Sequence, residues 1–539
     1  MLLRGTVITS SLTLLSRALG FVRDLLVARL LGASLFADVF FVAFRIPNLL
    51  RSFLAEGALT SAFVPVFTGS LAKGHEEAQA TFSRLTGFLI SITIPLSILG
   101  VLFTPEIVRL IAPGFAQDQE KFELCVLLTQ IMFPYIACVS LIAMINSALN
   151  SLQIFGASAW AQVFMNITLI GGALCALPFE PKVATLLLAV SVIIGGIVQI
   201  IAQLPACSRA KLSIRPSFAI FSRDVKETVG LMLPATLGAS VYQVTIFLST
   251  ILASTLPDGS VSWLFYADRI TQFPIGIFSI ALASVLLPAL AHASAQDDSA
   301  LFKRNLSNSL RFTNFVIIPM AAGLWALALP ITQVLFERGA FTHDSSIRTA
   351  QAIKALAFGL WATSCHSMIT RAFIAKKDTK TPTLIGLCSL VVGVVTSLIL
   401  MGPLPSEQGV FLQTLSWVQG SLCSVSGLSA HFGHVGLAAS SSIAAAASLI
   451  LVVSFFCARI GDFPWHTFIT SMSRSVCAAF GMVAAIYGLQ LLDFTPLTNC
   501  IISILGGVVA YALASLALQS AELLEGVTVL RKRLTSDNR

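Results

Sequence analysis

Long apolar runs constrain this 539-residue chain more than any other feature of its sequence. A run of about 20 apolar residues can cross about 30 Å of hydrocarbon as an α-helix. Charged residues make up only 11% of the chain, whereas a soluble domain carries about 25%. The composition excludes a cytosolic enzyme, a disordered chain and a disulfide scaffold, and it predicts an all-α polytopic membrane protein. The fourteen predicted transmembrane helices are 5–29, 35–63, 83–104, 124–149, 158–177, 184–206, 228–255, 262–291, 309–330, 350–374, 382–402, 434–457, 468–491 and 497–519.

Basic residues are distributed unevenly between the two sets of predicted loops. With a cytoplasmic N-terminus, the loops on that side hold 20 Lys and Arg residues and the opposite loops hold five. Cytoplasmic loops of membrane proteins are enriched in these residues, so we expect both termini in the cytoplasm. The net charge of +8 is explained in the same way, and we expect no nucleic-acid partner. The five basic residues of the outer side are Arg109, Lys121, Lys182, Arg338 and Arg348.

The chain also contains a weak internal repeat. A shift of about 224 residues places Phe40–Arg45 on Leu264–Arg269 and Gly114-Phe115 on Ala340-Phe341. Each repeat would hold six spans, which is an even number, so the halves would be parallel repeats around a central cavity suited to alternating access. The predicted parts are an N-lobe at 1–226, a C-lobe at 227–460, a C-terminal helix pair at 461–520 and a cytoplasmic tail at 521–539.

Ionisable residues inside the predicted spans are concentrated in the first repeat. The seventh span, the repeat partner of the first, has no charge between Glu227 and Asp258. Charges within a membrane usually line a cavity or pair with one another. In the first two spans five arginines face three carboxylates, so a ligand of about two negative charges would balance them, and guanidinium groups bind phosphate in bidentate fashion. The alternative, in which these arginines pair internally and bind nothing, stays open. The residues are Arg17, Arg23, Asp24, Arg29, Asp38, Arg45, Arg51 and Glu56, with Asp268 and Arg269 on the eighth span.

Several stretches resemble one known family. The sequence is similar to the MurJ (MviN) family of lipid II flippases, within the MOP exporter superfamily. The resemblance extends from about residue 5 to the last span, and the N-terminal pair of helices carries its most specific part. The matching stretches are Ser16–Asp24, Ala37–Arg51, Ala55–Ala58, Ala112–Phe115, Trp263–Arg269 and Asp378–Pro382.

The resemblance implies both a fold and a function. It implies two pseudo-symmetric six-helix lobes plus two C-terminal helices that help to form a groove for a polyprenyl tail. It also implies a transporter, not an enzyme, that moves lipid II from the inner to the outer leaflet of the bacterial cytoplasmic (inner) membrane. We expect lipid II and the bilayer as partners, no cofactor or metal, and a monomer. The resemblance assigns substrate binding to Arg17, Arg23, Arg51 and Arg269, matches Asp38 and Glu56 to acidic partners, and places Ser16 in the same lining motif. We expect gating or ion pairing from Ser16, Asp24, Asp38 and Glu56.

Other functions remain possible from the sequence. A flippase for another polyprenyl-pyrophosphate glycolipid needs the same charges, whereas a MATE-like cation or drug exporter needs unpaired carboxylates. A membrane glycosyltransferase needs acidic residues in outer loops, where Asp118, Glu120 and Glu123 are more simply explained as a solvated helix start. The longest outer loop, 403–433, would hold a short interfacial helix or be mobile.

Overall fold

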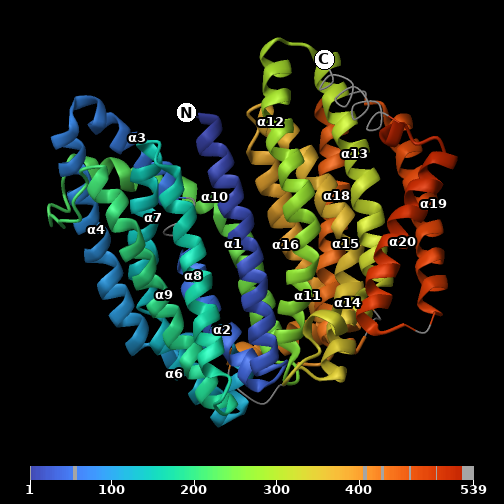
Figure 1. Cartoon of the computed structure of the whole chain (residues 1–539), viewed down its shortest axis with the longest axis horizontal. Helices are drawn as coiled ribbons and strands as arrows, with labels where there is room; N and C mark the ends of the chain where they lie inside the picture. Colours follow the sequence, from blue (N-terminus) through green and yellow to red (C-terminus); the bar gives the residue numbers. More distant parts are fainter. Residues whose placement is uncertain are drawn as a thin grey trace. The chain divides into compact units, whose positions relative to one another are not determined.

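The computed structural model describes an all-helical chain, and the part that it describes contains no strand. Residues 2–51, 58–404, 410–426, 430–460, 463–492 and 494–524 are described, with side chains left out at 2–10, 50–51, 58, 233–242, 410–411, 426 and 460. The predicted fold class, an all-α membrane protein, is confirmed (Figure 1).

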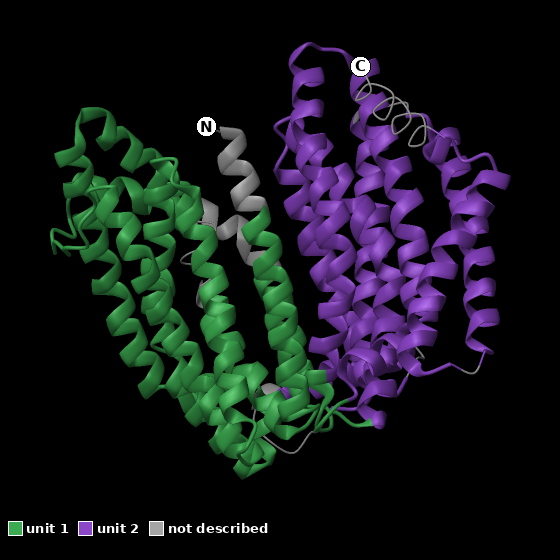
Figure 2. Cartoon of the chain, in the orientation of Figure 1, with its two compact units in different colours: residues 1–262, 338–342 green, residues 263–337, 343–539 purple. Residues whose placement is uncertain are grey.

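The helices belong to two compact units, which Figure 2 distinguishes by colour. Unit 1 consists of Met1–Ser262 and Arg338–Thr342, and unit 2 consists of Trp263–Glu337 and His343–Arg539. The elements of the first range are α1 Leu2–Leu31, α2 Leu35–Arg51, α3 Ala58–Lys73, α4 His75–Leu102, α5 Thr104–Ile111, the 3₁₀ turn η2 Pro113–Gln117, α6 Gln119–Met132, α7 Tyr135–Ser151, α8 Phe155–Ala176, α9 Pro181–Arg209 and α10 Arg223–Ser254. The later elements are α11 Ser260–Pro274, the π-helical turn η3 Ile275–Ser279, α12 Ile280–Ala295, α13 Ser299–Ala326, α14 Ala328–Phe336, α15 His343–Ala375, α16 Lys380–Leu400, α17 Val410–Ser426, α18 His434–Ile460, α19 Trp465–Gln490 and α20 Pro496–Ala517.

Each predicted span coincides with one helix or with successive helices. Among the described residues nine helices are long and apolar enough to cross a membrane, or ten if the pair α13 and α14, bent by 71°, is one span. The other four predicted spans fall on α1, on α2 with α3, on α10 and on α15. These segments carry charges or include residues outside the described part, so the total of fourteen stays a prediction. The lobe boundary near residue 227 also stays a prediction, because the compact units follow packing and keep α10 with the first half.

Helix starts follow local sequence signals. Asp298 caps α13 by accepting the Leu301 backbone N–H at 2.8 Å, and Thr495 caps α20 just before Pro496. A side-chain oxygen at this position satisfies a backbone donor that has no partner within the helix, and Pro is favoured at the first helical position. The acidic cluster of the outer loop is also a helix start, since Asp118 caps α6 by accepting the Lys121 backbone N–H at 3.1 Å.

Each unit has its own apolar interior. In unit 1, α3, α4 and α7 enclose a cluster that includes Phe63, Phe67 and Phe82, all fully buried. In unit 2, α12, α13, α15 and α18 enclose a second cluster that includes Leu306 and Met368. Outside these clusters many large apolar side chains are exposed, as expected for surfaces that face lipid.

The last two helices, α19 and α20, attach to the rest of unit 2 through α13. The Tyr511 hydroxyl of α20 donates to the Phe315 carbonyl at 2.8 Å. After α20, Glu522 pairs with Arg311 of α13 at 2.8 Å, and the side chain of Glu522 is only 6% exposed. Interhelical hydrogen bonds of this kind hold membrane helices together where lipid supplies no hydrophobic driving force.

The loop at 403–433, which the sequence predicts on the outer side, contains a helix, α17; a helix is one of its two expected forms. Gln419 anchors this helix, because its buried amide accepts the Leu404 N–H at 2.9 Å and donates to the Leu398 and Gly402 carbonyls. Trp417 on the same helix is 72% exposed. A position at the membrane surface stays a prediction for α17.

Candidate functional site

A polar cluster on α1 contains three of the predicted site residues. The Arg23 guanidinium donates to Asp24 Oδ1 from Nε at 2.9 Å and from Nη2 at 2.7 Å, and from Nη1 to Asn166 Oδ1 at 3.2 Å. The Asn166 amide nitrogen in turn donates to the carbonyl and hydroxyl oxygens of Ser16 at 3.0 and 3.1 Å. Asn166, on α8, therefore joins Ser16 to Arg23 across the surface of α1.

Arg17 differs from Arg23 in its surroundings. Its side chain is exposed and has no ion pair or hydrogen bond with any residue that the structure describes. Arg23 is mostly buried, with a side-chain exposure of 17%, and is held by Asp24. A cation held in this way is pre-oriented, while the charge of Arg17 is available to a ligand.

Two predicted ligand residues, Arg269 and Arg51, do not belong to this cluster as the structure describes it. Arg269 lies on α11 in unit 2 and is half-buried, beside the exposed Asp268. The side chain of Arg51 and all of Glu56 lie outside the described residues. The structure therefore brings together Ser16, Arg23 and Asp24, and leaves the grouping of all four arginines as a prediction.

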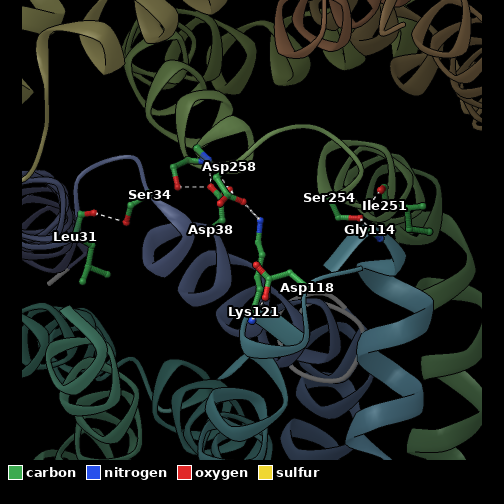
Figure 3. A network of polar contacts seen from close by, with 11 residues as sticks. Leu31, Ser34, Asp38, Gly114, Asp118, Lys121, Ile251, Ser254 and Asp258 are labelled. Carbon is green, nitrogen blue, oxygen red and sulfur yellow. Dashed lines mark hydrogen bonds and ion pairs between the residues drawn. The ribbon is translucent and has the colours of Figure 1, made fainter. Parts of the chain in front are cut away.

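Asp38 lies at the centre of a second cluster within unit 1, at the start of α11 (Figure 3). Its carboxylate is 1% exposed and accepts the backbone N–H groups of Gly259 and Ser262, each at 2.8 Å, and the Ser262 hydroxyl at 2.6 Å. An anionic acceptor at a helix N-terminus satisfies free N–H groups and complements the helix dipole. Asp38 therefore caps a helix from a distant part of the chain. Arg45, seven residues later on the same face of α2, instead donates to Thr250 of α10.

Lys121 completes this cluster, and the sequence did not indicate its role. Its ammonium lies 2.6 Å from Asp258 Oδ1, 3.7 Å from Asp38 Oδ2 and 4.1 Å from the centre of the Phe115 ring. The side chain is 5% exposed, although the residue was counted among the cations of the outer loops. Nothing in the local sequence distinguishes it from a solvated lysine. By contrast, the Asn166 amide lies within a predicted span, and a polar side chain there is a sequence signal of a buried polar contact.

Two loops of unit 1 make reciprocal contacts around this cluster, each with a helix of the other predicted repeat. The Gly114 N–H donates to the Ser254 hydroxyl at 3.3 Å, at the end of α10, and a Cβ at Gly114 would lie 2.2 Å from the Ser254 carbonyl oxygen. The Ala340 N–H donates to the Arg29 carbonyl at 2.9 Å, near the end of α1, and a Cβ at Gly339 would lie 2.4 Å from that oxygen.

The loop at Gly114 therefore packs on α10, and the loop at Gly339 packs on α1. Each loop contacts the first helix of the other predicted repeat. Asp38 and Ser262, which contact each other directly, are 224 residues apart, the same interval as the sequence repeat. Contact between equivalent residues is the property of a two-fold axis. We call this cluster, formed by Asp38, Lys121, Asp258 and Ser262 with the two glycine loops, the junction.

Comparison with known proteins gives one consistent family. A family model described as lipid II flippase MurJ matches residues 27–505. A probable lipid II flippase MurJ of Vibrio cholerae is 37% identical over 408 residues, covering 74% of this chain and 77% of that protein. The lipid II flippase MurJ of Burkholderia cenocepacia is 36% identical over 396 residues, covering 72% of this chain and 77% of its own.

Solved structures agree with this result. A lipid II flippase MurJ in an inward closed conformation matches with a TM-score of 0.75 at 26% identity, covering 94% of this chain and 98% of that chain. An inward-facing multidrug resistance transporter of the MATE family, MOP superfamily, matches with a TM-score of 0.65 over 84% of this chain and 98% of that one. At 14% identity the second likeness concerns the fold alone.

Proposed function

This chain belongs to the MurJ family of lipid II flippases, and we propose that its cavity arginines hold the pyrophosphate of lipid II during translocation. It is a multi-pass membrane transporter, not an enzyme, and its substrate is the lipid-linked precursor of peptidoglycan. The arginines that we assign to the pyrophosphate are Arg17, Arg23, Arg51 and Arg269.

The chemistry of the substrate explains why arginines are needed. Transfer of a bare ionised group into a medium of low dielectric constant costs tens of kcal/mol on the Born estimate. A sugar-peptide headgroup with a pyrophosphate therefore requires a polar, cationic cavity, while its polyprenyl tail can stay in lipid. A two-lobed protein with a cavity that opens sideways to the bilayer meets both requirements.

The exposed charge of Arg17, six residues before the fixed Arg23 on α1, is the observation that carries this proposal. In the proposed mechanism Arg17 binds a phosphate oxygen first. Arg23 then exchanges part of its contact with Asp24 for a second phosphate oxygen, since a guanidinium offers five donors. Asn166 keeps the Arg23 plane in position during this exchange.

The junction supplies the moving part of alternating access. We infer that both termini are cytoplasmic, as the loop charges predict, so that the junction lies on the outer side. Opening toward the outside then requires separation of Asp38 from the start of α11, and of each glycine loop from its partner helix. The tail would lie along the apolar stripe of α20, where Ile501, Leu505 and Val509 are about half exposed or more.

The membrane potential is the energy source that we propose. One charge that crosses 100 mV gains about 2.3 kcal/mol, so a pyrophosphate of roughly −2 that leaves a negative interior gains about 4–5 kcal/mol. Transport in sealed vesicles should therefore accelerate when an inside-negative potential is imposed. An unchanged rate would contradict this coupling without affecting the arginine sites.

A depletion strain tests the binding role. Each arginine is replaced by alanine in a plasmid copy, the native copy is depleted, and lipid II exposed on the outer leaflet is measured. We expect all four variants to insert normally and to fail in transport. Arg109→Ala is the matched control, because Arg109 on α5 is exposed and lies 3.9 Å from Glu106. Normal transport by all four variants would refute the assignment.

A further inference from the structure

The Asp378–Pro382 motif forms part of a pocket that the transport mechanism does not use. The pocket, of about 470 Å³, lies in unit 2 between the start of α16 and the end of α18. Lys380, Arg459 and Thr379 are among its polar lining residues, and Leu384, Leu387 and Phe455 form its apolar wall.

The polar rim of this pocket carries an excess of positive charge. Arg459 is fixed by Asp378 Oδ2 at 2.6 Å and by the Thr381 hydroxyl at 2.7 Å. The Thr381 hydroxyl and backbone N–H, together with Arg459, hold the pKa of Asp378 below its ordinary value, so the carboxylate stays ionised. Lys380 is exposed and has no ion pair or hydrogen bond with another described residue. The rim therefore holds two cations and one carboxylate, and only Arg459 contacts that carboxylate.

Below the rim, α16 presents a continuous apolar stripe. Leu384, Leu387 and Val391 follow Lys380 on one helix face, at spacings of four, seven and eleven residues. At 1.5 Å per residue, Leu387 lies about 10 Å beyond Lys380 along the axis. All three side chains are about half exposed. The order along the helix, cation first and apolar surface after, is the order of phosphate and acyl chain in a phospholipid.

We propose that this pocket binds an anionic phospholipid, with its phosphate between Lys380 and Arg459 and an acyl chain along Leu384, Leu387 and Val391. Basic pockets between transmembrane helices on the cytoplasmic side are a recognised form of anionic headgroup site. A guanidinium already oriented by Asp378 can accept a phosphate at its remaining donors, while the flexible ammonium of Lys380 adds a second contact. The site is separate from the arginines assigned to lipid II and does not depend on their role.

Native mass spectrometry of the purified full-length protein tests this site. The protein is titrated with phosphatidylglycerol and with phosphatidylcholine of identical acyl chains, and the bound lipid is quantified. We expect a preference for phosphatidylglycerol, which Lys380→Gln should lower about five-fold, since one basic residue near a membrane surface contributes about that factor. Lys377→Gln is the matched control: Lys377 is also exposed, lies three residues earlier and does not line the pocket. An equal loss in both variants, or in neither, would overturn the proposal.

Two further measurements separate a lipid from a free phosphate. Soluble glycerophosphoglycerol carries the same phosphodiester charge without acyl chains and should compete poorly with phosphatidylglycerol. Leu387→Ala keeps every charge but shortens the apolar wall, so it should weaken phosphatidylglycerol binding even if Lys380→Gln fails to fold. Competition by glycerophosphoglycerol at the same concentration as the lipid, or full binding by Leu387→Ala, would contradict a phospholipid site.

Discussion

The junction joins helices of the two predicted repeats, and the two sets of helices contribute different chemical groups to it. The first set is α1 and α2, and their repeat partners are α10 and α11. Helix α2 contributes the carboxylate of Asp38, whereas α11 contributes at the equivalent position the hydroxyl and N–H of Ser262. Helix α1 carries Arg23 and Asp24, while the charge-free stretch of α10 contributes hydroxyls such as that of Thr250. Because equivalent residues face each other at a two-fold axis, two copies of Asp38 would repel. Duplicated halves can therefore share a backbone but must differ chemically where they touch.

Removal of the central carboxylate should have the largest effect on this asymmetric junction. Asp38→Ala leaves the Gly259 and Ser262 N–H groups without their acceptor and leaves Lys121 with Asp258 alone. We expect a loss of roughly 3–5 kcal/mol in the free energy of unfolding, as for a buried ion pair that loses one partner. Unfolding of the purified protein in detergent measures it.

Ser262→Ala is the matched change on the second repeat. It removes only one hydrogen bond to the same carboxylate and should cost about 1 kcal/mol. If the two variants lose the same free energy of unfolding, the stability of the junction does not depend on the charge of Asp38. The chemical difference between the two repeats would then make no difference to stability.

The next largest effect is expected on transport, when the unpaired charge of Arg17 on α1 is removed. Arg17→Ala should lower transport about a hundred-fold, since a hydrogen bond to a charged group contributes about 1.5–3 kcal/mol. Arg17→Lys should be intermediate, because a point charge cannot replace a planar fork. The outer-leaflet lipid II assay measures both variants.

The charge-free stretch of α10, after Glu227, provides the comparison for Arg17. Thr250→Val removes the hydroxyl that Arg45 contacts and should change transport by less than about ten-fold. A larger effect from Thr250→Val than from Arg17→Ala would show that α10 holds the substrate and would reverse our assignment.

Substitutions in the two glycine loops test whether both loops pack equally closely against their partner helices. Gly114→Ala and Gly339→Ala each force a Cβ against a backbone carbonyl oxygen, and overpacking of this kind costs about 1–3 kcal/mol. Gly339 also has φ +64°, so its variant should be the less stable of the two. Gly171→Ala on α8 has nothing within 4 Å of the new Cβ and should lose no stability. Melting temperatures compare the three variants. Unchanged melting temperatures for Gly114→Ala and Gly339→Ala would contradict the close contact of these glycines with the two carbonyl oxygens.

The smallest expected effect concerns the link between Ser16 and Arg23. Asn166→Ala removes a neutral bridge but leaves the Arg23–Asp24 pair intact, so transport should fall only a few-fold. Thr168→Ala, on the same helix, removes only an intrahelical bond to the Phe164 carbonyl and serves as control. A fall as deep as that of Arg17→Ala would mean that the position of Arg23, not the charge of Arg17, limits transport.

Sequence reasoning was strongest for features that lie along the chain. The apolar runs of helices such as α9 and α18 predicted the helical membrane fold. The shift of about 224 residues made Asp38 and Ser262 equivalent positions, but their contact was seen only in the structure. The same reasoning missed Asn166 and Lys121. Nor does spacing along α2 settle the contacts: Asp38 and Arg45 are seven residues apart on one face, yet they contact α11 and α10 respectively.

The residues by themselves determined that this is a membrane-embedded helical protein with arginines in its first two predicted spans, because hydropathy and charge accumulate along consecutive residues. Only the tertiary structure decided which cation meets which carboxylate. Lys121 reaches Asp258, 137 residues away, and Arg23 reaches Asn166, 143 residues away. Such pairs depend on how helices are rotated and packed against one another, and no local pattern carries that information.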